Sequence, residues 1–332
     1  MQVLVLSHAD VIAALSPEAC EQAMAEVLAA RAAERAHMPL RTVMAPPDAQ
    51  GFMGLMPAWR GDPQPAFALK AICIMPGNPA RGLDAHQGTV TVFDAETGVP
   101  TAILDASAVT QIRTAAVSAV ATRKLARSDA RTLGILGSGV QGEAHLHALA
   151  RVRSFERIRI YSPNREHVEE LVERAGVLYG DGPLEVLGAA SAEQAVRGAD
   201  VVVLATSSRE PVLRREWLAP GAHINAVGAS TPAARELDVE TVAAAALFCD
   251  SRESLRAEAG EFQLAIRERA ISGEDHLRAE LGEVLAGVRP GRRSAEELTL
   301  FRSLGLAVED LAAAQVAVTV AQRDGLGVEV EL

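Results

Sequence analysis

Aromatic residues and an excess of positive charge are both missing from this sequence. Only 3% of the residues are Phe, Trp or Tyr, and the formal net charge at pH 7 is -11. A nucleic-acid partner ordinarily requires a basic surface for the phosphates and aromatic rings on which bases stack. The composition therefore argues against DNA or RNA as a partner, and the acidic surface mainly favours solubility.

Cysteine is scarce as well. Cys20, Cys73 and Cys249 are odd in number and widely spaced. This pattern does not fit a disulfide framework or a zinc site, and it is typical of reduced thiols in a cytosolic protein. We expect all three to be packing residues.

Long apolar runs are the third absence. No stretch reaches the roughly eighteen uninterrupted apolar residues of a membrane-spanning helix, and residues 1–7 lack the basic region of a signal peptide. These absences predict a cytoplasmic protein with no membrane partner.

What is present is enough apolar material for a large core. The chain has 332 residues, of which 49% are hydrophobic. This length favours two domains rather than one.

The most informative stretch is a glycine-rich turn between a strand and a helix. Residues 133–136 form an apolar run, Gly137, Gly139 and Gly142 follow as G-x-G-x-x-G, and a helical pattern continues to residue 150. The first glycine permits a tight turn, the second lets the backbone approach a pyrophosphate, and the third lets helix and strand pack closely. Taken alone, the same spacing also fits an ordinary glycine turn.

The surrounding pattern favours the nucleotide site. Further strands are predicted at residues 158–161, 200–206, 223–228 and 246–249, with helical stretches between the first of them. Alternating strands and helices predict a parallel sheet whose ligands bind at the carboxyl ends of the strands. The fold class is therefore α/β, with a Rossmann NAD(P)-binding domain.

The segment before the glycine turn reads differently. It predicts two helices within residues 7–36, then strands at residues 38–44, 51–56, 66–74, 89–93 and 100–104, and a helix at 105–125. The last helix, from 305 to about 323, is apolar on a broad face. We expect it to pack on this β-rich first domain or at a subunit interface.

Lys70 lies inside an apolar strand, where a charged side chain is costly. A buried ammonium has a lowered pKa unless an anion compensates it, and such lysines often serve in proton transfer or imine chemistry. The alternative is that Lys70 points to solvent from a half-exposed strand.

Two arginines and three histidines complete the candidate polar residues. Arg41 and Arg113 could clamp a carboxylate through two parallel hydrogen bonds, although most arginines are simply solvated. His86 is expected in a turn. His145 and His147 are two residues apart on a helix and face different directions, so we predict no metal site.

Several segments together resemble the ornithine cyclodeaminase/mu-crystallin family. They span nearly the whole chain, at residues 53–58, 69–70, 86–87, 113–118, 137–142, 220–230, 235–238 and 303–310. The resemblance implies a Rossmann domain, residues 121–304, inserted into a β-rich α+β substrate-binding and dimerisation domain, residues 1–120 plus 305–332. It also implies a homodimer.

The same resemblance implies roles for individual residues. Lys70 would be the proton donor or base beside the substrate nitrogen, Arg41 and Arg113 would hold the α-carboxylate, and Met56 and Ser230 would contact the substrate. Dinucleotide contacts would come from Arg113, Thr114, Gly137, Ser138, Gly139, Val140, Gln141, Ser162, Asn164, Arg165, Thr206, Ser207, Val227, Ala229 and Leu304.

Ser230 decides the branch of the family. Ornithine cyclodeaminases of the family carry an aspartate at the position of Ser230 and a glutamate in the strand of residues 53–56, whereas this pattern resembles mu-crystallin and the ketimine reductases. The expected function is NAD(P)H-dependent reduction of a small cyclic ketimine acid, pyrroline-2-carboxylate or piperideine-2-carboxylate. The alternatives are ornithine cyclodeaminase, alanine dehydrogenase and a non-catalytic NADPH-dependent binding protein.

The cofactor's ribose is expected to meet the turn after the second strand. Residues 161–165 read Tyr-Ser-Pro-Asn-Arg. No acid is present for a ribose 2′-hydroxyl, and Arg165 could pair with a 2′-phosphate, which favours NADP(H). Pro163 stands where NADP-using relatives tend to have arginine, so NAD(H) stays possible.

Overall fold

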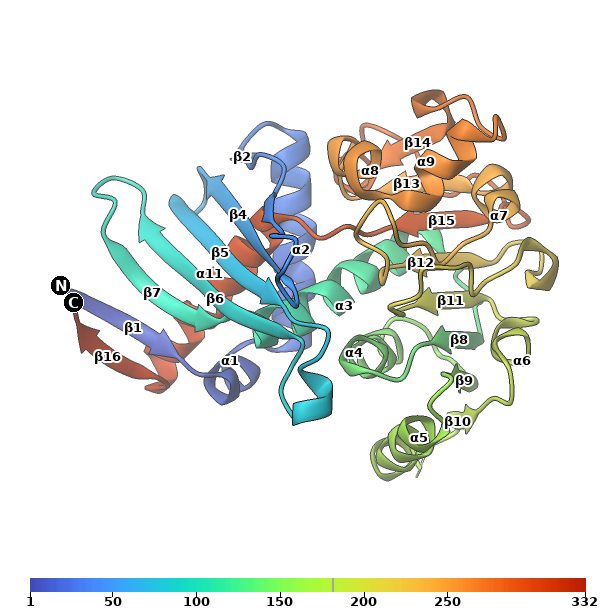
Figure 1. The fold of residues 1–332 in the computed structure, drawn as a ribbon, viewed down its shortest axis with the longest axis horizontal. Coiled ribbons are helices and arrows are strands. Elements are labelled where there is room, and N and C mark those ends of the chain that lie inside the picture. Colours follow the sequence, from blue (N-terminus) through green and yellow to red (C-terminus); the bar gives the residue numbers. More distant parts are fainter. Residues whose placement is uncertain (181) are drawn as a thin grey trace. The chain divides into compact units, whose positions relative to one another are not determined.

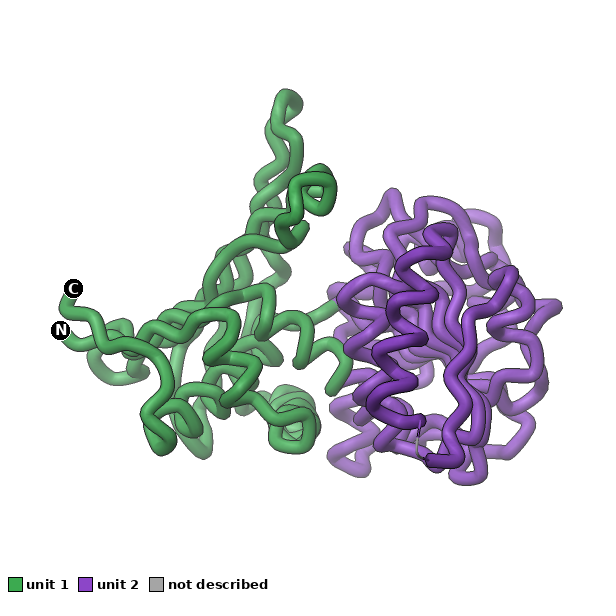
Figure 2. The backbone as a smooth tube through the Cα atoms, turned by 90° about the horizontal axis from the view of Figure 1, so that it is seen from below, with its two compact units in different colours: residues 1–116, 305–332 green, residues 117–304 purple. Residues whose placement is uncertain are grey.

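The computed structural model describes residues 1–180 and 182–332, which form two compact units (Figure 2). Unit 1 consists of Met1–Ala116 and Gly305–Leu332, and unit 2 consists of Val117–Leu304. The chain therefore leaves unit 1 once and returns to it once, which is the topology of an inserted domain.

Unit 1 is built on a mainly antiparallel sheet with the order β16–β1–β7–β6–β5–β4–β2, and β3 pairs with β4 (Figure 1). Only the β1–β7 pair is parallel among these pairings. The strands are β1 (Gln2–Leu6), β2 (Ala36–His37), β3 (Thr42–Met44), β4 (Phe52–Arg60), β5 (Ala66–Ile74), β6 (His86–Asp94), β7 (Pro100–Asp105) and β16 (Val328–Glu331).

One long helix covers a face of this sheet, and a second helix packs against that helix. Helix α2 (Pro17–Ala32) begins with Ser16 as its cap and Pro17 in its first turn. Helix α11 (Ala307–Asp324) packs against α2 and against β4, β5 and β6, and it ends at Gly325 in the left-handed conformation. The sequence left two places open for the last helix, the first domain or a subunit interface, and the structure shows it packed on the first of these.

The remaining helical segments of unit 1 connect these layers. They are α1 (His8–Ala14), the short turn η1 (Pro79–Arg81), and the first part of α3 (Ala106–Leu125). Asp105 caps α3 by accepting a hydrogen bond from the amide of Ala108.

Unit 2 is a parallel sheet with the order β10–β9–β8–β11–β12–β15–β13–β14. Every strand pairing in it is parallel, as the alternating sequence pattern predicts. The strands are β8 (Thr132–Leu136), β9 (Arg157–Tyr161), β10 (Glu185–Gly188), β11 (Val201–Leu204), β12 (His223–Ala226), β13 (Ala246–Cys249), β14 (Leu277–Glu280) and β15 (Thr299–Arg302).

The strand order reverses at β8, whose neighbours are β9 on one side and β11 on the other. Such a reversal opens a crevice at the carboxyl ends of the strands, where doubly wound sheets bind ligands. The helices of unit 2 are the second part of α3, α4 (Val140–Leu149), α5 (Arg165–Tyr179), α6 (Ala192–Val196), α7 (Val239–Ala244), α8 (Arg252–Glu258), α9 (Gly260–Arg267) and α10 (Leu281–Leu285), together with the short turns η2 (Arg215–Trp217) and η3 (Glu274–His276).

Three local expectations were wrong or incomplete. The stretch 38–44 forms a strand only at Thr42–Met44. His86 begins β6 instead of standing in a turn. Strands β2, β10, β14, β15 and β16 were not predicted, because segments of two to four residues are too short for a dependable periodic signal.

Within residues 1–180 and 182–332, no helix combines the length and the apolar character that crossing a bilayer requires.

Candidate active site

Lys70 lies on the covered face of the unit 1 sheet. Alternation along β5 buries Ala68, Lys70 and Ile72 together, and the register places Met56 of β4 and Val90 of β6 beside Lys70. The Lys70 side chain is only 2% exposed. The alternative that Lys70 points to solvent is therefore wrong.

Two oxygen atoms accept hydrogen bonds from the Lys70 ammonium. Its Nζ donates to Thr110 Oγ1 of α3 at 2.6 Å and to Asp310 Oδ1 of α11 at 3.0 Å. Burial lowers the pKa of Lys70 to about 8, with the Asp310 carboxylate opposing the effect and the charges of Arg113 and Arg41 adding to it. An amine with such a pKa can exchange a proton near neutral pH.

Asp310 also binds Arg113. The Nε of Arg113 donates to Asp310 Oδ1 at 2.9 Å, and its Nη1 donates to Glu309 Oε2 at 2.9 Å. Burial would raise the pKa of the Asp310 carboxyl, but the charges of Lys70 and Arg113 outweigh it and lower that pKa. Asp310 is therefore a buried carboxylate whose Oδ2 has no hydrogen-bond partner among the described residues.

Arg41 reaches the same region. Its Nη2 donates to the carbonyl oxygen of Gly305 at 2.9 Å. Gly305 has a φ of +78°, and a Cβ there would lie 2.8 Å from Nη2 of Arg113. The turn before α11 and the first turn of that helix thus bring Arg41, Arg113 and Lys70 into one region of unit 1.

Three of these residues were missed by sequence reasoning: Thr110, Glu309 and Asp310. A signal was available for the two acids, since they stand side by side in the first turn of a helix whose next residues, 311–314, are all apolar. A carboxylate buried at such a position requires a cationic partner.

His86 lies near this cluster. Burial lowers the pKa of His86, Asp84 opposes this effect, and the positive charges of Lys70 and Arg113 reinforce it. His145 and His147 have separate partners. The ring of His145 contacts Gln141 O and Ser118 Oγ, and that of His147 contacts Tyr179.

The glycine turn of unit 2 has the geometry of an anion site. Gly137 has a φ of +116°, and a Cβ at Gly142 would lie 2.1 Å from the carbonyl oxygen of Gly137. Gly139 caps α4 without any side-chain hydrogen bond, and a Cβ there would meet nothing within 4 Å. A side chain at Gly139 would therefore enter open space beside the start of α4, near Ser138, Val140 and Gln141, which fits a pyrophosphate at this helix N-terminus.

The turn after β9 carries the other predicted dinucleotide residues. The side chain of Asn164 caps α5 by accepting a hydrogen bond from the backbone amide of His167. The backbone amide of Asn164 donates to Ser162 Oγ. Arg165 is the first residue of α5 and is exposed, and it has no ion pair among the residues that the structure describes.

The remaining predicted residues follow other strand ends. Thr206 and Ser207 follow β11, Val227, Ala229 and the half-buried Ser230 follow β12, and Leu304 follows β15. All lie at the carboxyl ends of their strands, where the fold predicts ligand contacts. Thr114 differs: it lies in unit 1, where its hydroxyl donates to Thr110 O within α3.

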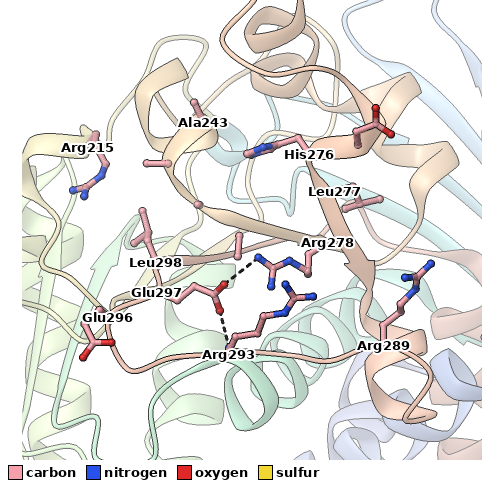
Figure 3. Close-up of a pocket in the computed structure, with 14 residues that line it drawn as sticks. Arg215, Ala243, His276, Leu277, Arg278, Arg289, Arg293, Glu296, Glu297 and Leu298 are labelled. Carbon is pink, nitrogen blue, oxygen red and sulfur yellow. Dashed lines mark hydrogen bonds and ion pairs between the residues drawn. The ribbon is translucent and has the colours of Figure 1, made fainter.

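A cavity of about 660 Å³ in unit 2 includes none of these residues (Figure 3). It lies at the amino ends of β13 and β14, whereas the glycine turn follows the carboxyl end of β8. The residues that line it include Arg215, Arg278, Arg289 and Arg293. Glu297 neutralises part of this charge by accepting from Arg278 and from the Arg293 amide.

Known proteins match almost all of this chain. Mouse ketimine reductase mu-crystallin is 41% identical over 278 residues, which cover 84% of this chain and 83% of the mouse protein. The structure of Thermococcus litoralis Delta(1)-pyrroline-2-carboxylate reductase in complex with NADH and L-proline superposes with a TM-score of 0.95. It is 35% identical and covers 99% of this chain and 100% of its own.

An archaeal alanine dehydrogenase, solved as a dimer with bound NAD, has a TM-score of 0.93 at 32% identity, with both chains fully covered. The model of the ornithine cyclodeaminase/mu-crystallin family matches residues 1–323. One unit carries the buried cluster of Lys70, Arg113, Glu309 and Asp310, and the other carries the glycine turn. The family model and the identity to these relatives show that this chain belongs to the ornithine cyclodeaminase/mu-crystallin family.

Proposed function

We propose that this protein uses NAD(P)H to reduce a small cyclic ketimine carboxylate, pyrroline-2-carboxylate or piperideine-2-carboxylate, to the cyclic amino acid. The observation that carries the proposal is the buried Lys70 ammonium, held by Thr110 and Asp310 beside Arg113. The likeness to a reductase solved with NADH and L-proline supports the substrate class.

Unit 1 is the substrate-binding domain in this proposal, and unit 2 is the dinucleotide-binding domain. Arg41 and Arg113 attract the substrate's α-carboxylate. Glu309 and Asp310 hold the Arg113 guanidinium in one orientation through Nη1 and Nε. A fixed guanidinium fixes the position of the α-carbon relative to Lys70.

Proton transfer is the task of Lys70. When bound, the nicotinamide supplies the hydride that the α-carbon accepts. Lys70 gives one proton to the substrate nitrogen, so the C=N bond becomes CH–NH and the lysine becomes a neutral amine. Asp310 stabilises the ammonium form before transfer, and a pKa of about 8 allows Lys70 to regain its proton from solvent.

Ser230 supports reduction rather than cyclodeamination. The residue is half-buried, after β12, and carries a hydroxyl where the resemblance gives cyclodeaminases an aspartate. Without a carboxylate, the second ammonium group of ornithine would lose its hydration on binding and gain no ionic partner, which is unfavourable.

A second candidate reaction is that of alanine dehydrogenase, which the likeness to the archaeal enzyme favours. It uses the same carboxylate clamp and the same proton donor, but its imine forms from pyruvate and free ammonia. The reduction steps are alike, but the cyclic ketimine is already formed, whereas the imine of pyruvate is smaller, is open-chain and needs free ammonia.

We further propose that NADP(H) is the preferred cofactor. Arg165 is exposed at the start of α5, and residues 161–165 include no acid that would repel a 2′-phosphate. The substitution Arg165→Ala should raise KM for NADPH about tenfold and leave KM for NADH unchanged. Equal effects on both cofactors would contradict the preference.

The deciding experiment follows nicotinamide absorbance with pyrroline-2-carboxylate or piperideine-2-carboxylate plus NADPH or NADH. Parallel reactions contain pyruvate plus ammonia, or ornithine plus NAD. Cofactor oxidation with a cyclic imine, reduced roughly 10²–10⁴-fold in Lys70→Ala, is the expected result. Lys124→Ala is the matched control, because Lys124 is the other lysine of the chain and is exposed.

Other results would reassign the reaction. Proline and ammonia formed from ornithine without net cofactor consumption would identify a cyclodeaminase. Turnover confined to pyruvate and ammonia would identify an alanine dehydrogenase.

A further inference from the structure

Glu236 is a buried acid that the reaction described above does not use. It lies between β12 and α7, and it has no exposed surface. Its carboxylate accepts four hydrogen bonds. Oε1 accepts from the amide of Thr206 at 2.7 Å and from its hydroxyl at 2.8 Å, and Oε2 accepts from the amides of Gly228 at 2.8 Å and Ala229 at 3.1 Å.

These four donors come from two different loops. Thr206 follows β11, and Gly228 and Ala229 follow β12. One side chain therefore ties together the loops at the carboxyl ends of two neighbouring strands. The backbone of Glu236 is itself anchored, since its carbonyl accepts from the amides of Val212 and Leu213.

The two loops also touch directly. A Cβ at Gly228 would lie 2.0 Å from the carbonyl oxygen of Thr206 and 2.6 Å from Oε1 of Glu236. Only glycine fits at this position without displacing the Thr206 backbone or the carboxylate. The junction therefore has little freedom to rearrange.

An arginine lies behind the junction and offsets its charge. Arg302 Nε pairs with Glu261 Oε1 at 2.6 Å, and its Nη1 donates to the carbonyl oxygens of Ala226 and Ser303. Burial raises the pKa of Glu236, and the positive charge of Arg302 opposes that rise. The backbone at the end of β12 is thus fixed by hydrogen bonds to both Glu236 and Arg302.

We propose that Glu236 is a positioning residue that sets the shape of the nicotinamide end of the dinucleotide site by joining the loops after β11 and β12. The inference rests on the proposed use of NAD(P)H. The glycine turn after β8 serves the pyrophosphate, and β11 and β12 are the next two strands in the sheet. Their loops are placed for the half of the cofactor beyond the pyrophosphate.

The test substitution is Glu236→Gln, which keeps the shape but replaces one acceptor oxygen with an NH₂ group. All four partners donate at present, so one loop must face a donor and lose its bonds. The dissociation constants for NADH, NADPH and ADP-ribose are measured by calorimetry. Glu240→Gln is the control, because Glu240 is exposed nearby on α7.

We expect the substitution to weaken NAD(P)H binding about tenfold and to leave ADP-ribose binding within about twofold of wild type, because ADP-ribose lacks the nicotinamide. With the imine that the protein turns over, kcat should fall more than KM for the imine rises. Equal losses for ADP-ribose and NAD(P)H would overturn the proposal and make Glu236 a purely structural residue, and unchanged binding would overturn it as well.

A second variant guards against misfolding. If Glu236→Gln does not fold, Glu236→Asp keeps the charge but is one methylene too short to reach both loops, and it should give the same selective loss. Because the binding measurements need no imine, they stand even if the proposed substrate is wrong. If wild type binds neither NADH, NADPH nor ADP-ribose, the dinucleotide site itself is refuted and the role of Glu236 is refuted with it.

Discussion

The two lysines of this chain occupy opposite environments. Lys124 is exposed near the end of α3, and Lys70 is buried between Thr110 and Asp310. Burial of an ammonium is unfavourable unless its hydrogen bonds and its charge are satisfied. The surroundings of Lys70 satisfy both in part, which leaves its pKa at about 8.

This pKa predicts opposite pH profiles for the two directions of the reaction. In the proposed mechanism Lys70 donates the proton, so reduction requires its ammonium form and kcat/KM should fall as pH rises through about 8. Oxidation of the cyclic amino acid requires the neutral amine and should rise over the same interval. Both rates are measured from about pH 6 to pH 10, and a reduction rate that stays constant across pH 8 would exclude Lys70 as the donor.

Asp310 should control both the rate and this profile. Asp310→Asn removes the carboxylate that favours the ammonium and one of the two acids bound to Arg113, so kcat/KM should fall on the order of 10- to 100-fold. The descending limb of the pH profile should also move to lower pH, because the charge of Asp310 raises the pKa of Lys70.

A control substitution on the same helix distinguishes a specific effect of Asp310 on Lys70 from an effect of removing any carboxylate of α11. Asp324→Asn alters an exposed partner of Arg323 and should leave rate and profile unchanged. A loss of rate in Asp310→Asn without any shift of the pH limb would mean that Asp310 supports the structure but does not tune Lys70.

At the scale of elements, the strand, glycine turn and helix around Gly137 were predictable because each signal is local. The three glycines are needed for backbone reasons that act within a few residues. The short strands β10, β14 and β15 were not predictable. Their four residues form strands because neighbouring strands supply hydrogen bonds, not because of their own side-chain pattern.

Gly139 and Gly142 should differ sharply when each is replaced by alanine. Gly142→Ala places a Cβ 2.1 Å from Gly137 O, so it should lower Tm and abolish dinucleotide binding together. Gly139→Ala meets no atom within 4 Å, and its extended backbone, with a φ of -81°, accepts alanine. This second substitution should leave Tm of the cofactor-free protein unchanged.

Cofactor binding distinguishes the two variants. The Cβ of Gly139→Ala would occupy the space that we assign to the pyrophosphate, so NADH affinity should fall about tenfold or more by fluorescence titration. Wild-type affinity in this variant would show that the anion does not bind at the start of α4.

At the scale of the whole molecule, the outer face of the unit 1 sheet carries apolar residues that no element of unit 1 covers. Phe67 is 47% exposed and lies near Trp59, and Leu55 is also exposed. Exposed apolar faces of this kind commonly serve as subunit interfaces. This face is therefore where we expect the interface of the homodimer that the family resemblance predicts.

The substitution Phe67→Glu should convert the dimer to a monomer, because it would bury a charge at the centre of the proposed interface. Light scattering after size-exclusion chromatography measures the mass. Val177→Glu is the matched control, since Val177 is 83% exposed on α5 of unit 2. A wild-type mass of about 35 kDa, or a dimer that survives Phe67→Glu, would contradict this interface.

The sequence by itself determined the features that depend on near neighbours. It identified the glycine turn, the parallel sheet of unit 2 and the family, and it placed Lys70 in an apolar strand. The tertiary structure alone decided which charges meet. Lys70 and Asp310 are 240 residues apart in the sequence, and they form an ion pair because α11 packs on β5. Periodicity reports which face of an element is buried, but it carries no information about which distant charge that face will contact.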